Sequence, residues 1–198
     1  MKAWNKGKRV GQKKAFKLED IWEIHIRLEL QNNIEPLLMF NLAIDSKLRS
    51  SDLIQLKVRD ISCSSLIQSR AIVEQKKTER EVQYEITPKT QQCLTLWIHN
   101  QNFTPSDYLF PSPRKKGSHI SYHYYSGIVK QWVTKLGLDL TQYNTHSLRR
   151  TKASLIYAKT KNLRAIQLLL GHSKLENTIE YLGVEIENAL TISEATET

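Results

Sequence analysis

The spacing of the apolar residues changes from a helical period to a period of two in one part of the chain, and this change sets the fold class. SRAIVE at 69–74 and EVQYEIT at 81–87 alternate between apolar and polar residues, which places Val82, Tyr84 and Ile86 on one face. Such alternation is typical of β-strands that are buried on one side. The polar QKKTER between the two segments predicts a turn, so the pair predicts an antiparallel hairpin.

Helical patterns lie on both sides of this hairpin. The expected helical segments are 18–31, 32–45, 52–58, one that starts after Thr87-Pro88, 122–137, 145–158, 162–171 and one that starts after 173. The segment 32–45 is apolar on most sides and is predicted to be a buried central helix. Thr145 is the expected cap of the helix that contains His146, Gly171 is the expected end of the next helix, and Ser173 opens a capping box. The chain is therefore predicted to be mainly α-helical with a small antiparallel β-sheet, an α+β fold.

The bulk composition fits one soluble globular domain. The chain has 198 residues, of which 40% are hydrophobic and 25% charged. No apolar run approaches the roughly 20 residues that a membrane-spanning helix requires, and the N-terminus lacks the apolar region of a secretory signal. Cys63 and Cys93 do not have the spacing of metal ligands. Neither a membrane protein nor a zinc module is expected.

Positive charge is concentrated at the N-terminus. Residues 1–17 carry seven Lys or Arg and no acidic residue, so they hold seven of the formal net charges of +9 and leave +2 for the other 181 residues. A flexible basic arm of this kind favours a polyanionic partner such as nucleic acid, because its cations neutralise phosphates and release counterions. The alternative is a tail that only increases solubility.

Four residues near the C-terminus could form a phosphate-binding site. His146 and Arg149 are three apart and share one helix face, His172 precedes a helix N-terminus, and Tyr181 lies nine residues later. Each residue alone has an ordinary alternative on a surface or in a packed interior. Helices 145–158 and 162–170 could also form a non-catalytic helix-turn-helix DNA-binding unit.

Five motifs in one order favour the catalytic interpretation. HSLRR, LLLGHS and IEYLG follow two upstream segments, NLAIDSKLRSSDLIQLKVRDI at 41–61 and EQKKTEREV in the hairpin. Together they resemble the tyrosine recombinases, also called phage-type integrases, from about residue 18 to 192. The layout is similar to that of the short fimbrial phase-variation invertases, which are little more than a catalytic domain. No separate N-terminal clamp domain is expected, because the first motif begins near residue 41, and the basic arm could replace part of such a clamp.

The resemblance implies cleavage and rejoining of duplex DNA through a covalent 3′-phosphotyrosine intermediate, without a metal or another cofactor. The implied catalytic residues are Arg49, Lys77, His146, Arg149, His172 and Tyr181. Tyr181 would be the nucleophile, Arg49 and Arg149 would clamp the phosphate, and Lys77 would be the general acid, with Lys76 as the alternative. His146 would accept the tyrosine proton, His172 would hydrogen-bond the phosphate, and Asp52 would orient Arg49.

The resemblance also implies the partners and the organisation of the chain. The expected parts are an arm at 1–17, a catalytic domain at 18–186 and a tail at 187–198 that could be exchanged between protomers. Double-stranded DNA, a dimer on each site and a tetramer in synapsis are expected in the bacterial cytoplasm at the nucleoid, with host DNA-bending factors as further candidates and no membrane. The basic residues expected to contact DNA are Lys6, Lys8, Arg9, Lys13, Lys14, Arg114, Lys115, Lys116, Arg150 and Lys152. A topoisomerase-like relaxing enzyme and a degenerate recombinase that binds DNA without strand exchange are the alternatives within this chemistry.

Overall fold

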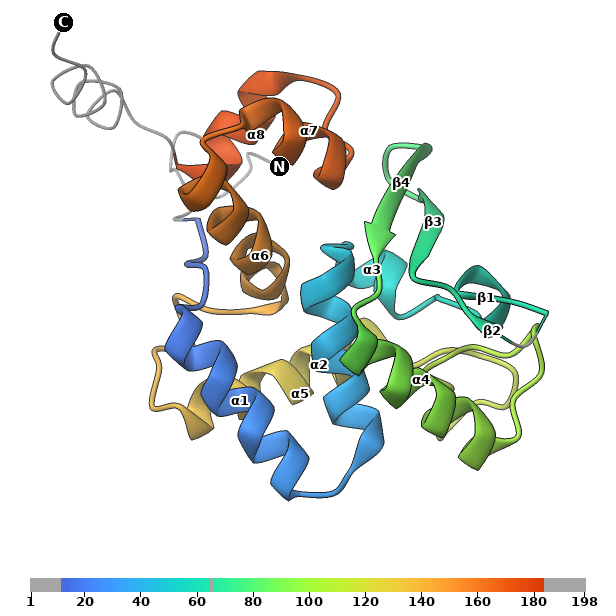
Figure 1. The fold of residues 1–198 in the computed structure, drawn as a ribbon. Coiled ribbons are helices and arrows are strands. Elements are labelled where there is room, and N and C mark those ends of the chain that lie inside the picture. The colour runs from blue at the N-terminus through green and yellow to red at the C-terminus, as the bar shows by residue number, and fades with distance from the viewer. Residues whose placement is uncertain (1–11, 65, 184–198) are drawn as a thin grey trace, which may run out of the picture.

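The computed structural model describes residues 12–64 and 66–183 (Figure 1). The helices in this part are α1 (Leu18–Leu30), α2 (Ile34–Ser46), α3 (Ser50–Leu53), α4 (Pro88–Gln101), α5 (Tyr122–Lys135), α6 (Thr145–Thr160), α7 (Leu163–Leu170) and α8 (Leu175–Leu182). The other elements are a 3-10 helix, η1 (Val58–Asp60), and the strands β1 (Ser62–Cys63), β2 (Leu66–Ile67), β3 (Arg70–Gln75) and β4 (Arg80–Glu85). The predicted α+β class with antiparallel pairing is confirmed.

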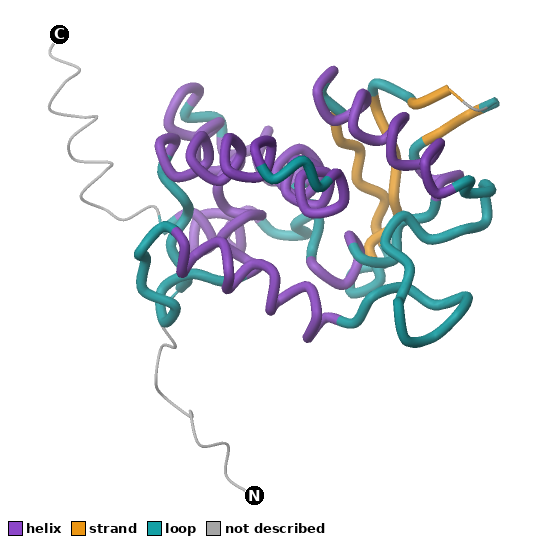
Figure 2. The backbone as a smooth tube through the Cα atoms, turned by 90° about the horizontal axis from the view of Figure 1, so that it is seen from below, coloured by secondary structure: helices purple, strands orange, loops and turns teal. Residues whose placement is uncertain are grey.

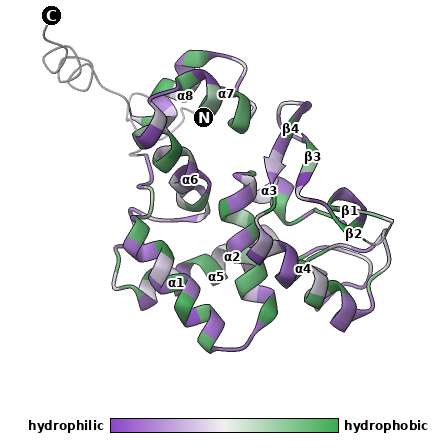
Figure 3. Cartoon of the chain, in the orientation of Figure 1, coloured by the Kyte–Doolittle hydropathy of each residue, from purple (hydrophilic) through white to green (hydrophobic). Residues whose placement is uncertain are grey.

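Helix α2 is the centre of the main core, as its apolar sequence predicts. Leu38, Met39 and Leu42 are completely buried, and α2 packs against α1, α4, α6 and β4. The outer helices α1 and α4 carry hydrophobic and hydrophilic residues in turn, as expected for helices that are buried on one side (Figure 3). The strands lie together at one end of the molecule (Figure 2).

The last three helices form a separate small unit. Ala153 of α6 and Ile166 and Leu170 of α7 make a second buried cluster, against which Tyr181 and Leu182 of α8 pack. This unit also contacts β4 through α7. The nucleophile candidate is therefore carried by α8, which packs on α6 and α7, and α7 lies next to the hairpin (Figure 1).

The predicted hairpin is present, with strands that differ from the expected ones by one or two residues at their ends. Strands β3 and β4 pair antiparallel with Val73 opposite Val82, and the turn spans 76–79. A second, smaller hairpin formed by β1 and β2 was not predicted. The sequence also predicted a helix at 52–58, which is wrong, since α3 ends at Leu53. Backbone hydrogen bonds from Val58 and Arg59 to the loop at 105–107 hold this segment in another conformation.

Two helix caps differ from the predicted ones. The cap of α6 is Asn144, whose side-chain oxygen accepts from the His146 backbone N–H at 2.8 Å. Thr145 is instead inside the helix and buried. Helix α8 is preceded by Lys174 without a side-chain cap, so the box expected from Ser173 is not formed. By contrast, α7 ends at Gly171 as predicted, with a left-handed φ of +66°.

Residues 12–17 are packed on the domain, which corrects the expected boundary of the arm. Phe16 is buried and stacks on Tyr143 with 5.0 Å between ring centroids. Its backbone N–H donates to Thr151 Oγ1 at 3.0 Å, and the Lys14 N–H donates to the Gln142 carbonyl at 2.9 Å. The aromatic ring and these hydrogen bonds hold the segment against α6. Residues 1–11 of the predicted arm lie outside the described residues.

Phe16→Ala should lower the free energy of unfolding by about 3 kcal/mol or more, because it removes a buried aromatic side chain and leaves a cavity. Urea unfolding followed by circular dichroism measures this change. Leu18→Ala is the matched control two residues later, where the side chain is 54% exposed, and its effect should stay within about 0.5 kcal/mol. Equal stability of Phe16→Ala and the wild type would place residues 12–17 in the arm after all.

Candidate active site

The residues of the three C-terminal motifs meet between the α6–α8 unit and the hairpin. His146 and Arg149 lie in the first two turns of α6, His172 connects α7 to α8, and Tyr181 is in the last turn of α8. Arg149 is 3% exposed, and its Nη2 donates to the Leu170 carbonyl at 2.8 Å. A buried guanidinium therefore lies at the centre of the site.

Tyr181 is held between a histidine and an arginine. The His172 ring meets its ring edge to face, with centroids 5.4 Å apart, and the Arg150 guanidinium carbon lies 5.4 Å from its ring centroid. Burial raises the pKa of Tyr181 to about 12, although the charges of Arg149, Arg150 and Arg49 act in the opposite direction. The phenol is therefore protonated at neutral pH.

Three buried polar atoms at this point form no hydrogen bond of good geometry among the described residues. They are Arg149 Nη1, Arg150 Nε and the Tyr181 hydroxyl, and the Arg149 guanidinium lies next to that hydroxyl. Burial, together with the charge of nearby Arg49, lowers the pKa of Arg149 to about 10, so Arg149 still carries its charge at pH 7. A charged donor and a hydroxyl without partners suit an incoming anion, because unpaired buried polar groups are unfavourable.

Both histidines are neutral in this environment. Burial lowers the pKa of His172 to about 4, with the charges of Arg149 and Arg49 acting in the same direction. The pKa of His146 is also lowered, first by burial and then by Arg149, Arg49 and Lys77. His172 Nδ1 lies 3.1 Å from Thr178 Oγ1, which orients its ring. A neutral imidazole can accept a proton or share a hydrogen bond, as general-base and phosphate-binding roles require.

Arg49 and the lysine turn complete the group. Arg49 precedes α3, and its Nη1 donates to the side chain of Gln75. Lys76 and Lys77 are both exposed in the turn of the hairpin. The charge of Lys77 acts on His146, whereas the Lys76 backbone N–H donates to Asp52 Oδ1 at 3.3 Å. The arrangement favours Lys77 over Lys76 as the lysine that faces the site.

Asp52 contacts a different partner from the one expected. It is 4% exposed, and within the described part of the chain it forms neither an ion pair nor a hydrogen bond with Arg49. Its Oδ1 instead accepts from the backbone of Lys76, and its charge raises the pKa of Arg149. Asp52 therefore holds the base of the lysine turn, while a neutral amide binds Arg49.

Arg150 was expected to contact DNA phosphates, but the structure places it against Tyr181. Its Nη1 donates to Gln12 Oε1 at 3.0 Å, and the same Gln12 side chain donates to the Glu180 carbonyl through Nε2. The segment that precedes α1 thus joins Arg150 to the last turn of α8.

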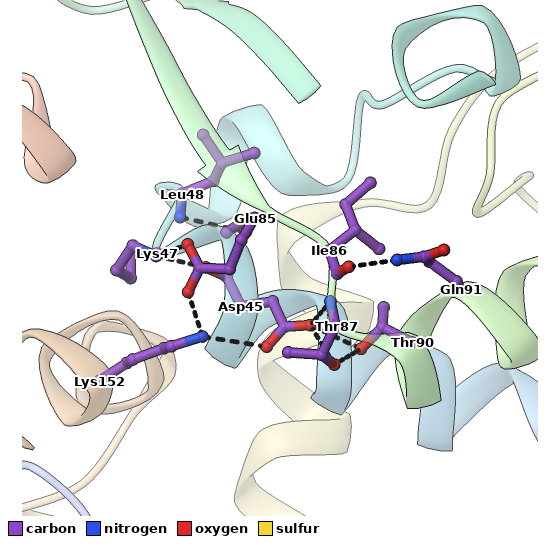
Figure 4. A network of polar contacts seen from close by, with 10 residues as sticks. Asp45, Lys47, Leu48, Glu85, Ile86, Thr87, Thr90, Gln91 and Lys152 are labelled. Atoms are coloured by element: carbon purple, nitrogen blue, oxygen red, sulfur yellow. Dashed lines mark hydrogen bonds and ion pairs between the residues drawn. The ribbon is translucent and has the colours of Figure 1, made fainter. Parts of the chain in front are cut away.

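Lys152, another expected DNA contact, has ion-pair partners within the protein. Its Nζ forms ion pairs with Asp45 Oδ1 at 3.2 Å and with Glu85, and Glu85 binds the buried Lys47 at 3.1 Å. Figure 4 shows this network, in which Thr87 also donates to Asp45. Through these ion pairs Lys152 joins α6 to α2 and to the hairpin.

The other predicted DNA contacts are spread over the surface. Arg114, Lys115 and Lys116 are exposed in a loop closed by the bridge between Pro111 and His119. Lys14 is exposed, and Lys13 donates from Nζ to the Thr141 carbonyl at 2.5 Å. Lys6, Lys8 and Arg9 lie outside the described residues.

Gln75 belongs to the site but was not predicted from the sequence. It follows Ala71 and Val73 on the inward face of β3, so strict alternation could have identified it as buried. A buried glutamine needs polar partners, and in this position the partners belong to the site.

The described residues contain neither a membrane-spanning helix nor a cluster of metal ligands. No described helix has the length and apolar character needed to cross a bilayer. In residues 12–64 and 66–183 no group of three or more His, Cys, Asp or Glu side chains is placed to hold a metal ion.

The chain resembles known proteins over most of its length. Residues 15–187 match the model of the phage integrase family. The probable integrase/recombinase YoeC of Bacillus subtilis is 27% identical over 168 residues, which cover 85% of this chain and 87% of that protein. A tyrosine recombinase of Pseudothermotoga lettingae is 34% identical over 165 residues, and the match covers 82% of this chain but only 54% of that relative.

Solved structures show the same fold. The XerA recombinase has a TM-score of 0.74 at 16% identity and covers 95% of this chain, which matches 67% of XerA. XerH bound to its difH substrate before cleavage has a TM-score of 0.73 at 18% identity, with 93% of this chain and 55% of XerH covered. The catalytic domain of bacteriophage HP1 integrase has a TM-score of 0.60 at 18% identity, with coverage of 91% and 95%.

Acidification should destabilise the DNA-free protein between the unfolded histidine pKa of 6.5 and the folded His172 pKa of about 4. In this window the unfolded chain binds a proton that folded His172 does not bind, so the free energy of unfolding falls as pH falls. Urea unfolding at about pH 7 and about pH 5 measures the loss. His172→Asn should reduce it, whereas His99→Asn, at an exposed position of α4, should not. An identical pH dependence for His172→Asn and the wild type would contradict the neutral state of His172.

Proposed function

Because the chain belongs to the phage integrase family, we propose that it is a tyrosine-type site-specific recombinase that cuts and rejoins duplex DNA. The observation that carries the proposal is the position of Tyr181 beside Arg149, Arg49 and His172, while the charges of both arginines and of Lys77 act on His146. Strand cleavage without an external energy source needs a nucleophile, a phosphate clamp and a proton donor, and these residues supply all three.

In the cleavage step the phosphoryl group of the DNA strand is transferred from a 5′-oxygen to the Tyr181 oxygen. The Tyr181 oxygen attacks the scissile phosphorus, the bond from phosphorus to the 5′-oxygen breaks, and a 3′-phosphotyrosine and a free 5′-hydroxyl result. His146 accepts the phenol proton, and Lys77 donates a proton to the leaving oxygen. Religation follows the same steps in reverse, with a 5′-hydroxyl as the nucleophile.

Charge stabilisation in this step comes from the protein. Arg49 and Arg149 offer fork-shaped donors to the non-bridging oxygens as negative charge builds up on them. The unpaired Arg149 Nη1 is one such donor. His172 adds a hydrogen bond to the phosphate, and Arg150, which lies over the ring of Tyr181, favours the phenolate as its proton leaves.

Assembly and partners belong to the same proposal. The chain spans about half the length of the Pseudothermotoga relative, so the activity of the whole relative is inferred here. We infer duplex DNA as the partner, with one dimer on each site and a tetramer in synapsis, in a bacterial cytoplasm. Exchange of the 187–198 tail would concern residues outside the described part. Basic residues 1–17 and Arg114, Lys115 and Lys116 are proposed to contact phosphates, which position a protein on DNA without reading its sequence.

Tyr181→Phe should abolish a covalent protein–DNA adduct that the wild type forms. The duplexes are first selected from a random pool by binding to this chain and are then nicked near their centre, so that cleavage releases a short strand and traps the enzyme. The reaction is run in EDTA and the adduct is detected by SDS gel electrophoresis, because a phosphotyrosine survives SDS.

The matched control is Tyr157→Phe, at a half-buried tyrosine of α6, which should keep the adduct. If Tyr181→Phe still formed the adduct, Tyr181 would not be the nucleophile. Selective binding by the wild type without any adduct would support the helix-turn-helix alternative or a degenerate recombinase.

Lys77→Ala should slow the cleavage of an ordinary phosphodiester by about 10²-fold or more, the usual contribution of a general acid. A 5′-bridging phosphorothiolate at the scissile position should restore cleavage, because a thiolate leaves without protonation. Single-turnover rates measure both effects. Lys76→Ala is the neighbouring control and should behave as the wild type. If Lys76→Ala were the slow variant and the phosphorothiolate restored its cleavage, Lys76 would be the general acid instead of Lys77.

A further inference from the structure

A single buried amide, the side chain of Gln75, connects the two arginines of the site. Gln75 is the last residue of β3 and is 0% exposed. Its Oε1 accepts from Arg49 Nη1, and its Nε2 donates to the Leu170 carbonyl at 3.2 Å. The same carbonyl accepts from Arg149 Nη2 at 2.8 Å. One amide and one carbonyl thus separate the two guanidinium groups.

The surroundings allow only one orientation of this amide. Thr78 Oγ1 lies 3.1 Å from Gln75 Oε1 and can donate to it, while the Leu170 carbonyl can only accept, so the amide nitrogen has to face Leu170. Gly171 closes the remaining space, since a Cβ there would lie 3.1 Å from Gln75 Oε1 and 2.6 Å from Val82 Cγ1. The position of the amide is therefore fixed by the hairpin and by the end of α7.

A neutral partner preserves the charge that a phosphate clamp requires. A carboxylate in the place of Gln75 would neutralise Arg49, whereas an amide binds one of its donors and leaves the charge in place. The Leu170 carbonyl is at the C-terminal end of α7, where helix carbonyls lack partners within the helix. Gln75 and Arg149 together satisfy it, which ties α7 to the hairpin at the point where the arginines meet.

We propose that Gln75 is a positioning residue that sets the distance and orientation between Arg49 and Arg149 and so shapes the clamp for the scissile phosphate. It acts through the arginines and does not touch the substrate. The proposal rests on the recombinase activity inferred above. The competing role is simple stabilisation of the hairpin, which would not depend on the charge of the phosphate.

The test compares Gln75→Met with the wild type on two substrates. Methionine has a similar length and volume but neither donates to Leu170 nor holds Arg49 as an amide does. Single-turnover cleavage of the selected nicked duplex should fall by about 10- to 100-fold, as expected for misplaced catalytic groups. A methylphosphonate at the scissile position replaces one charged oxygen by a neutral methyl group. The two proteins should then differ by only about threefold, because little charge is left to neutralise.

Three results would overturn the proposal or separate it from the proposed function. An equal loss on both substrates would assign Gln75 to stabilisation of the hairpin. A wild-type rate of Gln75→Met on the ordinary phosphodiester would show that the clamp does not need it. If the wild type formed no adduct on the ordinary phosphodiester, the recombinase activity itself would be rejected.

Two matched variants protect the test from a folding defect. Gln83→Met makes the same change at an exposed position of β4 and should cleave both substrates at wild-type rates. Gln75→Glu keeps the size of the side chain and an acceptor toward Arg49, but it neutralises Arg49 and faces the Leu170 carbonyl. It should show the same loss on the phosphodiester and the same recovery on the methylphosphonate, with Gln83→Glu as its control. Thermal unfolding of each variant establishes that it is folded at the assay temperature.

Discussion

The site depends on one buried cation, the guanidinium of Arg149. It is 3% exposed and is held by the Leu170 carbonyl, and no carboxylate of the described residues pairs with it. An uncompensated buried charge is unfavourable, so the fold has to fix it in place and supply its hydrogen bonds. Helices α6 and α7 do so through the small cluster that they share with α8. Together with burial, this charge keeps His172 neutral, and it partly offsets the effect of burial on Tyr181.

The two ends of the β3–β4 hairpin differ in whether their charged side chains form ion pairs. At its base, Glu85 binds Lys47 and Lys152, and these pairs attach β4 to α2 and α6. At its tip, the charge of Lys77 acts on His146, and Lys77 forms no ion pair among the described residues. Paired charges at one end stabilise the scaffold, while cations at the other end remain available to an anion. The same strand pair thus anchors the core and completes the site, with Gln75 between the two regions.

Local sequence patterns predicted correctly those helices and strands whose formation depends mainly on residues close together in the chain. Alternation identified the hairpin, all-round apolarity identified α2, and Gly171 marked the end of α7, because a left-handed residue is most easily glycine. What local patterns did not predict involves partners distant in the chain. The ion pairs of Lys152 with Asp45 and Glu85 form only because α6 packs beside α2 and β4. The helix expected at 52–58 is broken by hydrogen bonds to a loop some fifty residues away, from Val58 to Asp107 for example.

The sequence alone determined the chemical inventory of the site and its order, since residue types, motif spacing and the period of apolar residues are properties of the chain itself. Tertiary structure decided which of these groups meet and what charge each one carries. It gave Arg49 a neutral amide in place of Asp52, placed Arg150 over Tyr181, and packed residues 12–17 onto the domain. The physical reason is that protonation, pairing and burial depend on distances between segments far apart in the chain, and folding alone sets those distances.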